Sequence, residues 1–224
     1  MKIVISEVQY QKLVEDKEEP KILRIPSLKL FSNDWFLLQK FLERKGNPPY
    51  LVGGNVDLEA YPIESLGNLQ SVGGYLNLLG SPIKSLGNLQ SVGGNLNLYE
   101  TKIESLGNLI SVGEDLDLSN TSIESLGNLV SVGGGLNLYN TSLESLGNLQ
   151  SVGGNLYLRK TPIKSLGNLQ SVGGYLSLAN TSIKSLGNLQ SVGGGLILID
   201  TPLSKMYNEK QIRKMVNVEG DIYL

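Results

Sequence analysis

Apolar residues recur along most of this chain in a pattern that repeats every 20 residues. The segment Ser-Leu-Gly-Asn-Leu begins at Ser65 and at every twentieth residue up to Ser185, without insertion or deletion. Within the unit 73–92 the apolar positions are Leu76, Leu78, Ile83, Leu86, Leu89 and Val92. The spacing of two predicts a short strand with its leucines facing inward and Asn77 facing outward. The later spacings of three, without apolar i, i+4 pairs, predict a chain that bends around a core and is not helical.

A unit of this length is too short to bury its own apolar face, whereas stacked units bury that face against each other. Each coil then pairs its strand with the strand of the next coil at ~4.8 Å. We therefore expect a mainly β fold, a parallel β-solenoid of about nine coils. Its strands are expected to start at Val52, Val72, Val92, Val112, Val132, Val152, Val172, Val192 and Val218.

Two polar columns run through the repeat and are interpreted as turn-forming residues. An asparagine follows the Leu-Gly pair of each unit, and its side chain can hydrogen-bond the backbone at a turn. A hydroxyl residue follows each strand, where it can hold the bend. The two columns are Asn68, Asn88, Asn108, Asn128, Asn148, Asn168 and Asn188, and Ser81, Thr101, Thr121, Thr141, Thr161, Thr181 and Thr201.

The repeat resembles a known family. The segment LNLYETKI, residues 96–103, is similar to the leucine-rich-repeat core L-x-L-x-x-N-x-L, with threonine in place of the usual asparagine. The longer segment SLGNLQSVGGNLNL resembles the repeat of receptor L domains and their fungal cell-wall relatives. The resemblance covers roughly residues 52–201, and it implies a right-handed solenoid.

The two ends of the chain differ from the repeat, as the exposed ends of a solenoid require. We expect a helical N-terminal cap and linker over residues 1–51, the solenoid over 52–203, and a C-terminal cap over 204–224. The segment SNDWFLLQKFLERKG predicts an amphipathic helix with Ser32 or Asn33 as its N-cap and Gly46 as its stop.

Three further segments of the caps carry their own signals. A second short N-terminal helix is indicated by a capping box of Ser6 and Gln9, and the segment PKILRIPSLKLF is interpreted as an extended linker or strand. The C-terminal cap is expected to be a helix that begins near Asn208, followed by a final strand in VEGDIYL.

Composition excludes several classes of function. Lys and Arg total 19 against 21 Asp and Glu, so a net charge of −2 gives no basic surface for nucleic acid or an anionic membrane. The chain has no cysteine and no histidine, which removes thiolate chemistry and the commonest general base and transition-metal ligand. We found no signal-peptide core and no apolar run of membrane-spanning length. We expect a soluble cytoplasmic protein that is a monomer or weak dimer.

The chain contains no nucleophile elbow, P-loop or dinucleotide fingerprint. We predict that it is not an enzyme, with no catalytic residues, no cofactor and no metal. One alternative was weighed, namely that the stacked carboxylates of Glu104, Glu124 and Glu144, ~5 Å apart, hold a cation. A solvated row of charges is the interpretation we prefer.

Candidate contact residues are the outward positions that differ between otherwise near-identical coils. These positions are rich in Tyr, Asn, Asp, Arg and Gly, the composition of adaptable recognition surfaces. We predict a protein partner bound through Tyr75, Asn77, Asn97, Tyr99, Asp117, Asn137, Tyr139, Tyr157, Arg159 and Tyr175. Of these, Tyr99, Tyr139 and Tyr157 are the predicted anchors. The competing hypothesis is a passive structural spacer whose outward residues have drifted.

Overall fold

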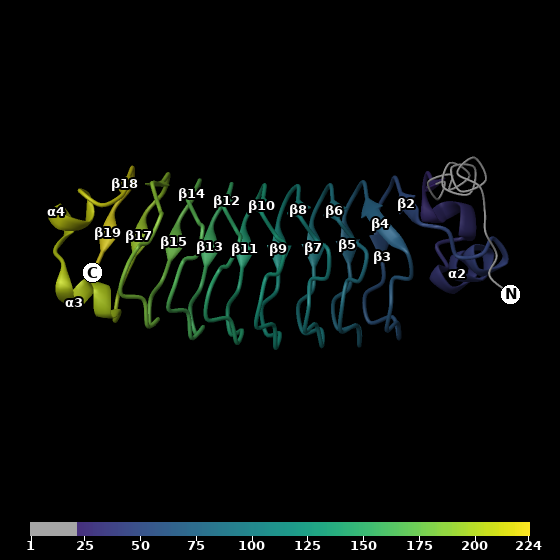
Figure 1. The fold of residues 1–224 in the computed structure, drawn as a ribbon, viewed down its shortest axis with the longest axis horizontal. Coiled ribbons are helices and arrows are strands. Elements are labelled where there is room, and N and C mark those ends of the chain that lie inside the picture. Colours follow the sequence, from purple (N-terminus) through teal and green to yellow (C-terminus); the bar gives the residue numbers. More distant parts are fainter. Residues whose placement is uncertain (1–21) are drawn as a thin grey trace, which may run out of the picture.

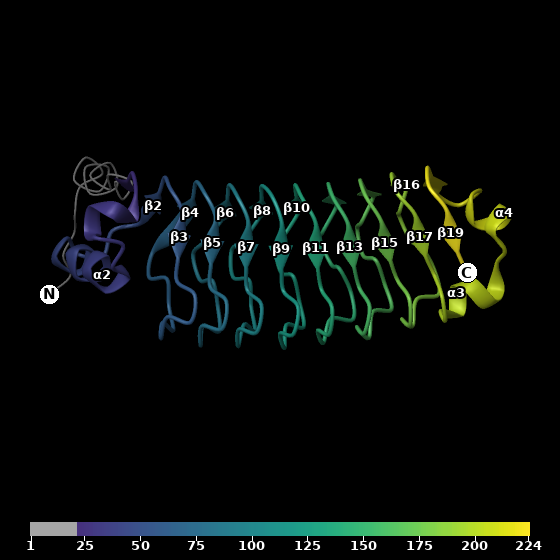
Figure 2. The same cartoon turned by 180° about the vertical axis from the view of Figure 1, so that it is seen from behind.

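The computed structural model describes residues 22–224, and it is a parallel β-solenoid with a cap at each end (Figures 1 and 2). The coils stack along the long axis of the molecule. The predicted helix with the Ser6–Gln9 capping box lies outside the described residues. Within those residues, no helix is both long enough and apolar enough to cross a membrane.

Two parallel sheets run the length of the solenoid. The first sheet has ten strands in the order β1 (Leu23–Ile25), β2 (Tyr50–Val52), β4 (Leu69–Val72), β6 (Ser91–Val92), β8 (Ser111–Val112), β10 (Ser131–Val132), β12 (Ser151–Val152), β14 (Ser171–Val172), β16 (Ser191–Val192) and β18 (Asn217–Val218). The second sheet has nine: β3 (Val56–Asp57), β5 (Leu76–Asn77), β7 (Leu96–Asn97), β9 (Leu116–Asp117), β11 (Leu136–Asn137), β13 (Leu156–Tyr157), β15 (Leu176–Ser177), β17 (Leu196–Ile197) and β19 (Ile222–Tyr223).

The expectation of one strand per coil, starting at the valine, is corrected by this arrangement. In each coil the valine ends a strand of the first sheet, and the following Gly-Gly-x segment turns the chain into a strand of the second sheet. The turn occurs at the glycines because neighbouring coils approach closely there. A Cβ atom added to Gly153 would lie far inside van der Waals contact with the carbonyl oxygen of Gly133.

The solenoid has about seven regular turns, fewer than the nine coils expected. The strands from β4 to β16 pair in one constant register, with Ser71 opposite Ser91 and each later serine opposite the next. The first and last levels are less regular. The pairing of β2 with β4 contains a register shift at Tyr50, and β18 comes after the C-terminal helices.

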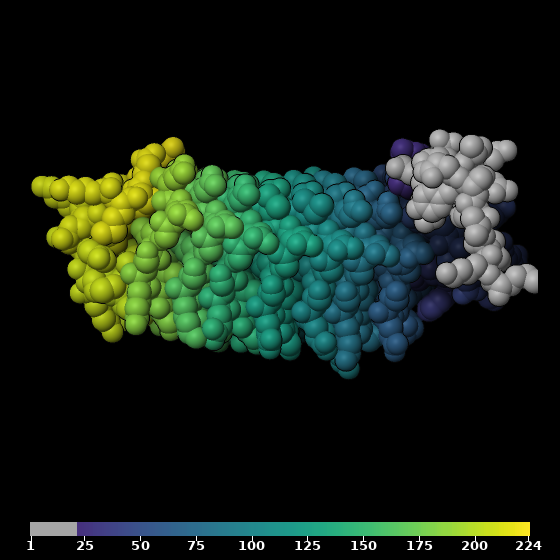
Figure 3. Space-filling model, in the orientation of Figure 1, coloured from purple at the N-terminus to yellow at the C-terminus, as the bar shows by residue number. Residues whose placement is uncertain are grey.

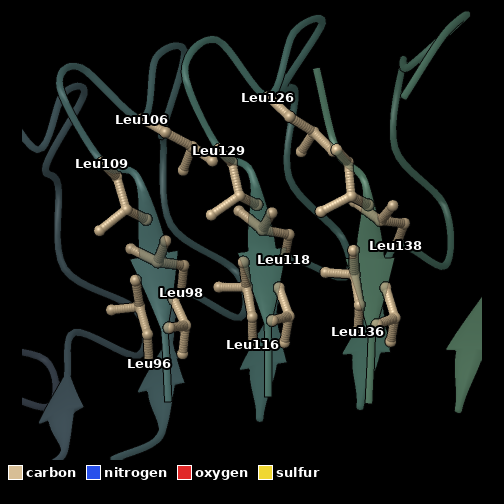
Figure 4. Close-up of a cluster of buried hydrophobic side chains, with 14 of the residues drawn as sticks. Leu96, Leu98, Leu106, Leu109, Leu116, Leu118, Leu126, Leu129, Leu136 and Leu138 are labelled. Atoms are coloured by element: carbon tan, nitrogen blue, oxygen red, sulfur yellow. The ribbon is translucent and has the colours of Figure 1, made fainter. Parts of the chain in front are cut away.

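The core consists of columns of identical aliphatic side chains. Leu96 and Leu98 are buried, and they lie beside Leu116 and Leu118 of the next coil and Leu136 and Leu138 of the coil after that (Figure 4). Leu106, Leu109 and their equivalents form further buried columns. Each coil covers the leucines of its neighbours, which confirms that the 20-residue spacing encodes stacking. The space-filling view shows a continuous surface across the coils (Figure 3).

Side-chain hydrogen bonds hold the bends of each coil. As predicted, the threonine hydroxyl donates to the carbonyl of the second strand leucine, for example from Thr101 Oγ1 to the Leu98 oxygen at 2.8 Å. In the turn before the first strand, Ser85 Oγ accepts from the Gly87 amide at 3.1 Å, and this contact recurs in every regular coil. The predicted backbone contact of the asparagine column is confirmed in places, since Asn148 Nδ2 donates to the Gly127 carbonyl at 3.1 Å. Asn88 Nδ2 donates instead to the Asn68 side chain, at 3.1 Å from its Oδ1.

The N-terminal cap contains the predicted amphipathic helix, α2 (Trp35–Arg44). Its N-cap is Asp34 and not Ser32 or Asn33, because both of those residues have positive φ and the Asp34 carboxylate accepts from two amides of the first turn. Trp35, Leu38 and Leu42 are buried on the face that contacts the first coil.

The segment PKILRIPSLKLF is partly strand and partly helix. It forms β1, which pairs with β2, and a 3-10 helix, η1 (Leu28–Phe31). A buried tyrosine ties the cap to the solenoid: the Tyr50 hydroxyl donates to the Leu66 carbonyl at 2.8 Å and accepts from Gln39 Nε2 at 3.0 Å. Burial raises the pKa of Tyr50 far above its usual value.

The C-terminal cap confirms the predicted helix and adds a second one. The helix α4 (Glu209–Ile212) begins after Asn208, which forms a capping box with Gln211, while α3 (Pro202–Met206) was not predicted. The Arg213 guanidinium donates to the carbonyls of Val218 and Gly220 at 2.7 and 2.9 Å. These bonds satisfy part of the edge of the first sheet.

Candidate functional site

The predicted contact residues lie together on the outer face of the second sheet. They form three columns: the residue before each strand, the outward residue within it, and the residue two positions later. Asn77, Asn97, Asp117, Asn137 and Tyr157 form the middle column, because their strands pair in register. The first column contains Tyr75 and Tyr175, and the third contains Tyr99, Tyr139 and Arg159.

The amide and carboxylate residues of the middle column are engaged in local structure. The side-chain oxygen of Asn97 accepts from the Tyr99 amide at 3.0 Å, and Asn77, Asp117 and Asn137 make the same contact at 3.2, 2.8 and 3.1 Å. Asn137 Nδ2 also points to Asp117 Oδ2 at 3.4 Å, between coils. These four side chains hold the end of the strand, a role that the sequence analysis did not assign to them.

The first column contains a second set of structural contacts. Asn95 Oδ1 accepts from the amide of Asp115 at 2.9 Å, and Asp115 Oδ1 accepts from the amide of Gly135 at 2.6 Å. Asn155 does the same for Tyr175 at 2.8 Å. A side-chain oxygen in one coil thus orients the backbone of the next coil.

The tyrosines are the large side chains of this face, and each is at least partly exposed. Tyr75, Tyr157 and Tyr175 are 37, 43 and 50% exposed, whereas Tyr99 and Tyr139 are half-buried. The hydroxyl of Tyr157 accepts from Asn155 Nδ2 at 3.0 Å, which holds the ring along the face.

Charged groups accompany two of the tyrosines. Lys160 Nζ lies 5.1 Å from the centre of the Tyr139 ring, within the range of a cation–π interaction. Hydrogen bonding with Glu100 is the main cause that raises the pKa of Tyr99. Arg159 is exposed beside these residues.

A hollow of about 420 Å³ lies on this face, over β9, β11 and β13. Its lining includes the carboxylates of Asp115 and Asp117 on one side and Asn155 and Tyr157 on the other. Gly135 lies between them, at a position where the neighbouring coils carry the side chains of Asp115 and Asn155. Sequence reasoning missed Asp115 and Gly135 as site residues, although the break in the column at Gly135 is visible in the repeat.

Beside the third column, one backbone position of every coil has a left-handed conformation. Gly80, Asn120, Asn140 and Asn180 occupy this position and tolerate it. The same conformation, with φ between 52° and 60°, is imposed on Ala60, Glu100, Lys160 and Asp200.

The glutamate column forms surface ion pairs. Lys84 Nζ lies 3.3 Å from Glu104 Oε1, and Lys164 Nζ lies 2.7 Å from Glu144 Oε1, with all four side chains at least 60% exposed. In residues 22–224 no group of three or more Asp and Glu side chains is arranged to hold a metal ion.

A second, larger hollow of about 620 Å³ follows the outer face of the first sheet. It is lined by the Ser-Val-Gly segments of five successive coils and by Glu219. The same three residue types recur at each level, so this groove offers a ligand no feature that distinguishes one coil from the next.

Comparisons with family models, with curated proteins and with solved structures gave no match to this chain.

Proposed function

We propose that this protein is a non-enzymatic recognition scaffold that binds a protein partner through the outer face of the second sheet. The observation that carries the proposal is the concentration of exposed aromatic side chains on this face, where otherwise near-identical coils differ. Tyrosine anchors dominate many protein interfaces, because a tyrosine contributes a large contact area with little side-chain entropy to lose.

The aromatic residues are unevenly distributed, which favours recognition. Tyr139, Tyr157 and Tyr175 come from three successive coils, with Arg159 beside them. Adjacent strands lie ~4.8 Å apart, so the three coils that carry these rings span about 10 Å along the stack. Tyrosine and arginine are the residue types most enriched among interface residues that contribute strongly to affinity.

We also propose that the coils are a form of leucine-rich repeat. Stacked coils of 20 residues with a regular Leu-x-Leu strand are compatible with that assignment. Leucine-rich repeats present their strand face as a binding surface, which agrees with the face proposed here.

The alternative function is that of a structural spacer with no specific ligand. It is favoured by the hydrogen bonds of Asn77, Asn97 and Asn137, which use outward side chains to stabilise the coils. A spacer of this kind would need the regular stack and nothing on its surface.

An affinity capture experiment separates the two functions. The full chain and a Tyr99→Ser, Tyr139→Ser, Tyr157→Ser variant would be compared as baits in lysate of the source cells, with quantitative mass spectrometry. Circular dichroism would establish that both are folded. Recognition through this face predicts partners that the native chain captures and the variant loses.

A matched control carries three exposed substitutions at residues that immediately precede strands β6, β12 and β14 of the first sheet, Gln90→Ser, Gln150→Ser and Gln170→Ser. This control should retain the partners. Equal capture by all three baits, or capture by none, would overturn the proposal in favour of the spacer.

A further inference from the structure

The hollow on the second sheet owes its shape to one missing side chain. In the first column, Asp115, Gly135 and Asn155 occupy successive coils, so the two side chains that flank the glycine come from strands about 10 Å apart, measured between backbones. The floor of the hollow is formed by Gly134 and Gly135 and its sides by the flanking polar residues. Its volume of about 420 Å³ can admit a single side chain of a partner.

One side of the hollow is acidic. Asp115 and Asp117 line it, and neither belongs to the three ion pairs formed among residues 22–224. Asp117 accepts from the backbone and side chain of Ser119 and from Asn137, and it keeps its negative charge. Asp115 uses Oδ1 to accept from the Gly135 amide, and its Oδ2 makes no hydrogen bond within the described part of the chain. Unpaired negative charge therefore faces the gap.

The opposite side is aromatic. Tyr157 is held along the face by Asn155, and both residues line the hollow. A planar cation placed over Gly135 would meet a carboxylate on one side and a tyrosine ring on the other. A guanidinium group suits this arrangement, because it pairs with carboxylates through two N–H groups and stacks on aromatic rings.

The acidic coil also departs from the repeat at an otherwise regular glycine. Glu114 takes the place of the second glycine of the Gly-Gly pair, which is present in the coils on either side as Gly94 and Gly134. The same coil places two aspartates, Asp115 and Asp117, in the outward columns, and the next coil supplies the gap at Gly135. The residues that differ from the repeat thus belong to two adjacent coils, and both coils line the hollow.

We propose that this hollow binds an arginine side chain presented by the protein partner. The inference rests on the proposed recognition function and specifies the chemistry of one contact. Asp115 and Asp117 supply the negative charge, Tyr157 supplies the stacking surface, and Gly135 supplies the space.

The first test uses capped arginine (N-acetyl-arginine amide) as the probe in an NMR titration of the full-length, ¹⁵N-labelled protein. Capped citrulline, which has nearly the same shape and no charge, is the control ligand. We expect saturable shifts at the amides of Gly134, Gly135, Asn137 and Tyr157, and affinity for citrulline that is lower by about tenfold. Absence of saturable shifts at these amides, or equal affinity for the two probes, would overturn the proposal.

Two variants locate the site without disturbing the fold. Gly135→Tyr fills the gap with a residue that other coils carry at the same position, as Tyr75 and Tyr175. A Cβ atom at Gly135 would lie 3.3 Å from the carbonyl oxygen of Asn155, a contact that needs only a small adjustment. We expect this variant to lose arginine binding while its circular dichroism spectrum stays unchanged.

The second variant, Asp115→Asn, removes charge and keeps the oxygen that accepts from the Gly135 amide. Asparagine stands at the same position in other coils, as Asn55 and Asn155. Its matched control is Asp57→Asn, the same change three coils away on the same face. We expect Asp115→Asn to weaken binding of capped arginine by about three- to tenfold and Asp57→Asn to leave it unchanged. Equal effects of the two would contradict a local site.

The capture experiment with Gly135→Tyr as bait distinguishes this inference from the broader function. Loss of the partner by both Gly135→Tyr and the tyrosine variant supports both proposals. Loss by the tyrosine variant alone leaves the recognition face standing and rejects the arginine site. Tighter binding of capped lysine or of a neutral sugar than of capped arginine in the titration would also reject it.

Discussion

Relief of backbone strain in the left-handed column should stabilise the solenoid measurably. The perturbation is the triple substitution Ala60→Asn, Glu100→Asn and Lys160→Asn. Each residue has a φ between 52° and 60°, the conformation that Asn120 and Asn140 adopt in the intervening coils. The substitutions therefore give three coils the residue that other coils already carry at this position.

The magnitude follows from the conformational preference of the residues. A left-handed backbone costs an ordinary L-residue about 1–2 kcal/mol, and asparagine avoids part of this cost. We take about 0.5 kcal/mol as the net gain at each site, after the loss of contacts such as that of Lys160 with the Tyr139 ring. The three sites lie two or three coils apart, roughly 10–14 Å, so their effects should add to about 1.5 kcal/mol in the free energy of unfolding.

Urea unfolding followed by circular dichroism measures this gain as a higher midpoint at an unchanged slope. The control is Lys102→Asn, which replaces an exposed side chain at a position without positive φ. An unchanged or lower midpoint for the triple variant, or an equal rise for the control, would refute the argument from backbone strain.

Three further predictions concern the core and the cap. Gly153→Ala should destabilise the protein by several kcal/mol or prevent folding, because its Cβ would clash with the Gly133 carbonyl oxygen, and a loss below about 1 kcal/mol in urea unfolding would contradict this. Ser81→Thr should stabilise the protein by about 1 kcal/mol. The buried Ser81 hydroxyl has no hydrogen-bond partner within residues 22–224, whereas threonine at the equivalent positions donates to the strand carbonyl, which here is that of Leu78. Thermal unfolding measures the gain. Tyr50→Phe should cost about 1 kcal/mol at neutral pH through lost hydrogen bonds. The pKa of Tyr50 is raised in the native protein, so above about pH 10 this tyrosine ionises in the unfolded chain and stays neutral in the native one. The native protein should therefore lose stability as the pH rises above about 10. Unfolding measured against pH should show a smaller loss for Tyr50→Phe.

The sequence allowed close prediction of the core and much of the caps. Because the leucines have the same spacing in every unit, stacking each leucine on its equivalent in the next coil buries all of them, and the structure contains these columns of buried leucines. The helix α2 was predicted from its apolar face, and a C-terminal helix was expected to begin near Asn208, where α4 begins.

Three features were hidden for physical reasons. The segment V-G-G-x-L-x-L alternates like a single strand, and only the close approach of glycines in neighbouring coils shows that it turns between two sheets. The left-handed position was concealed by residues such as Glu100 and Lys160, which do not favour that conformation. The hollow at Gly135 depends on the three-dimensional neighbours of a residue that has no side chain.

For the candidate site, the sequence predicted which face carries the variable residues but not how they are used. Asn97 and Asn137 were grouped with the tyrosines because all are outward and polar. The backbone geometry at the end of each strand determines that the asparagine oxygens accept from the amide two residues later. A list of residue types does not show whether a polar side chain hydrogen-bonds the nearby backbone or remains free for solvent and partners.

The constant register that joins the coils also poses a problem for folding. The strands of the first sheet from β6 to β16 are the same Ser-Val pair. A coil that skips its neighbour and pairs with the next one therefore forms the same backbone bonds and leucine contacts. A pairing displaced by 20 residues changes the contacts only at the two caps and at the few distinctive coils, such as the one containing Glu114. The irregular residues of this chain therefore have a second role, because their contacts favour the pairing of each coil with its immediate neighbour in an otherwise uniform sequence.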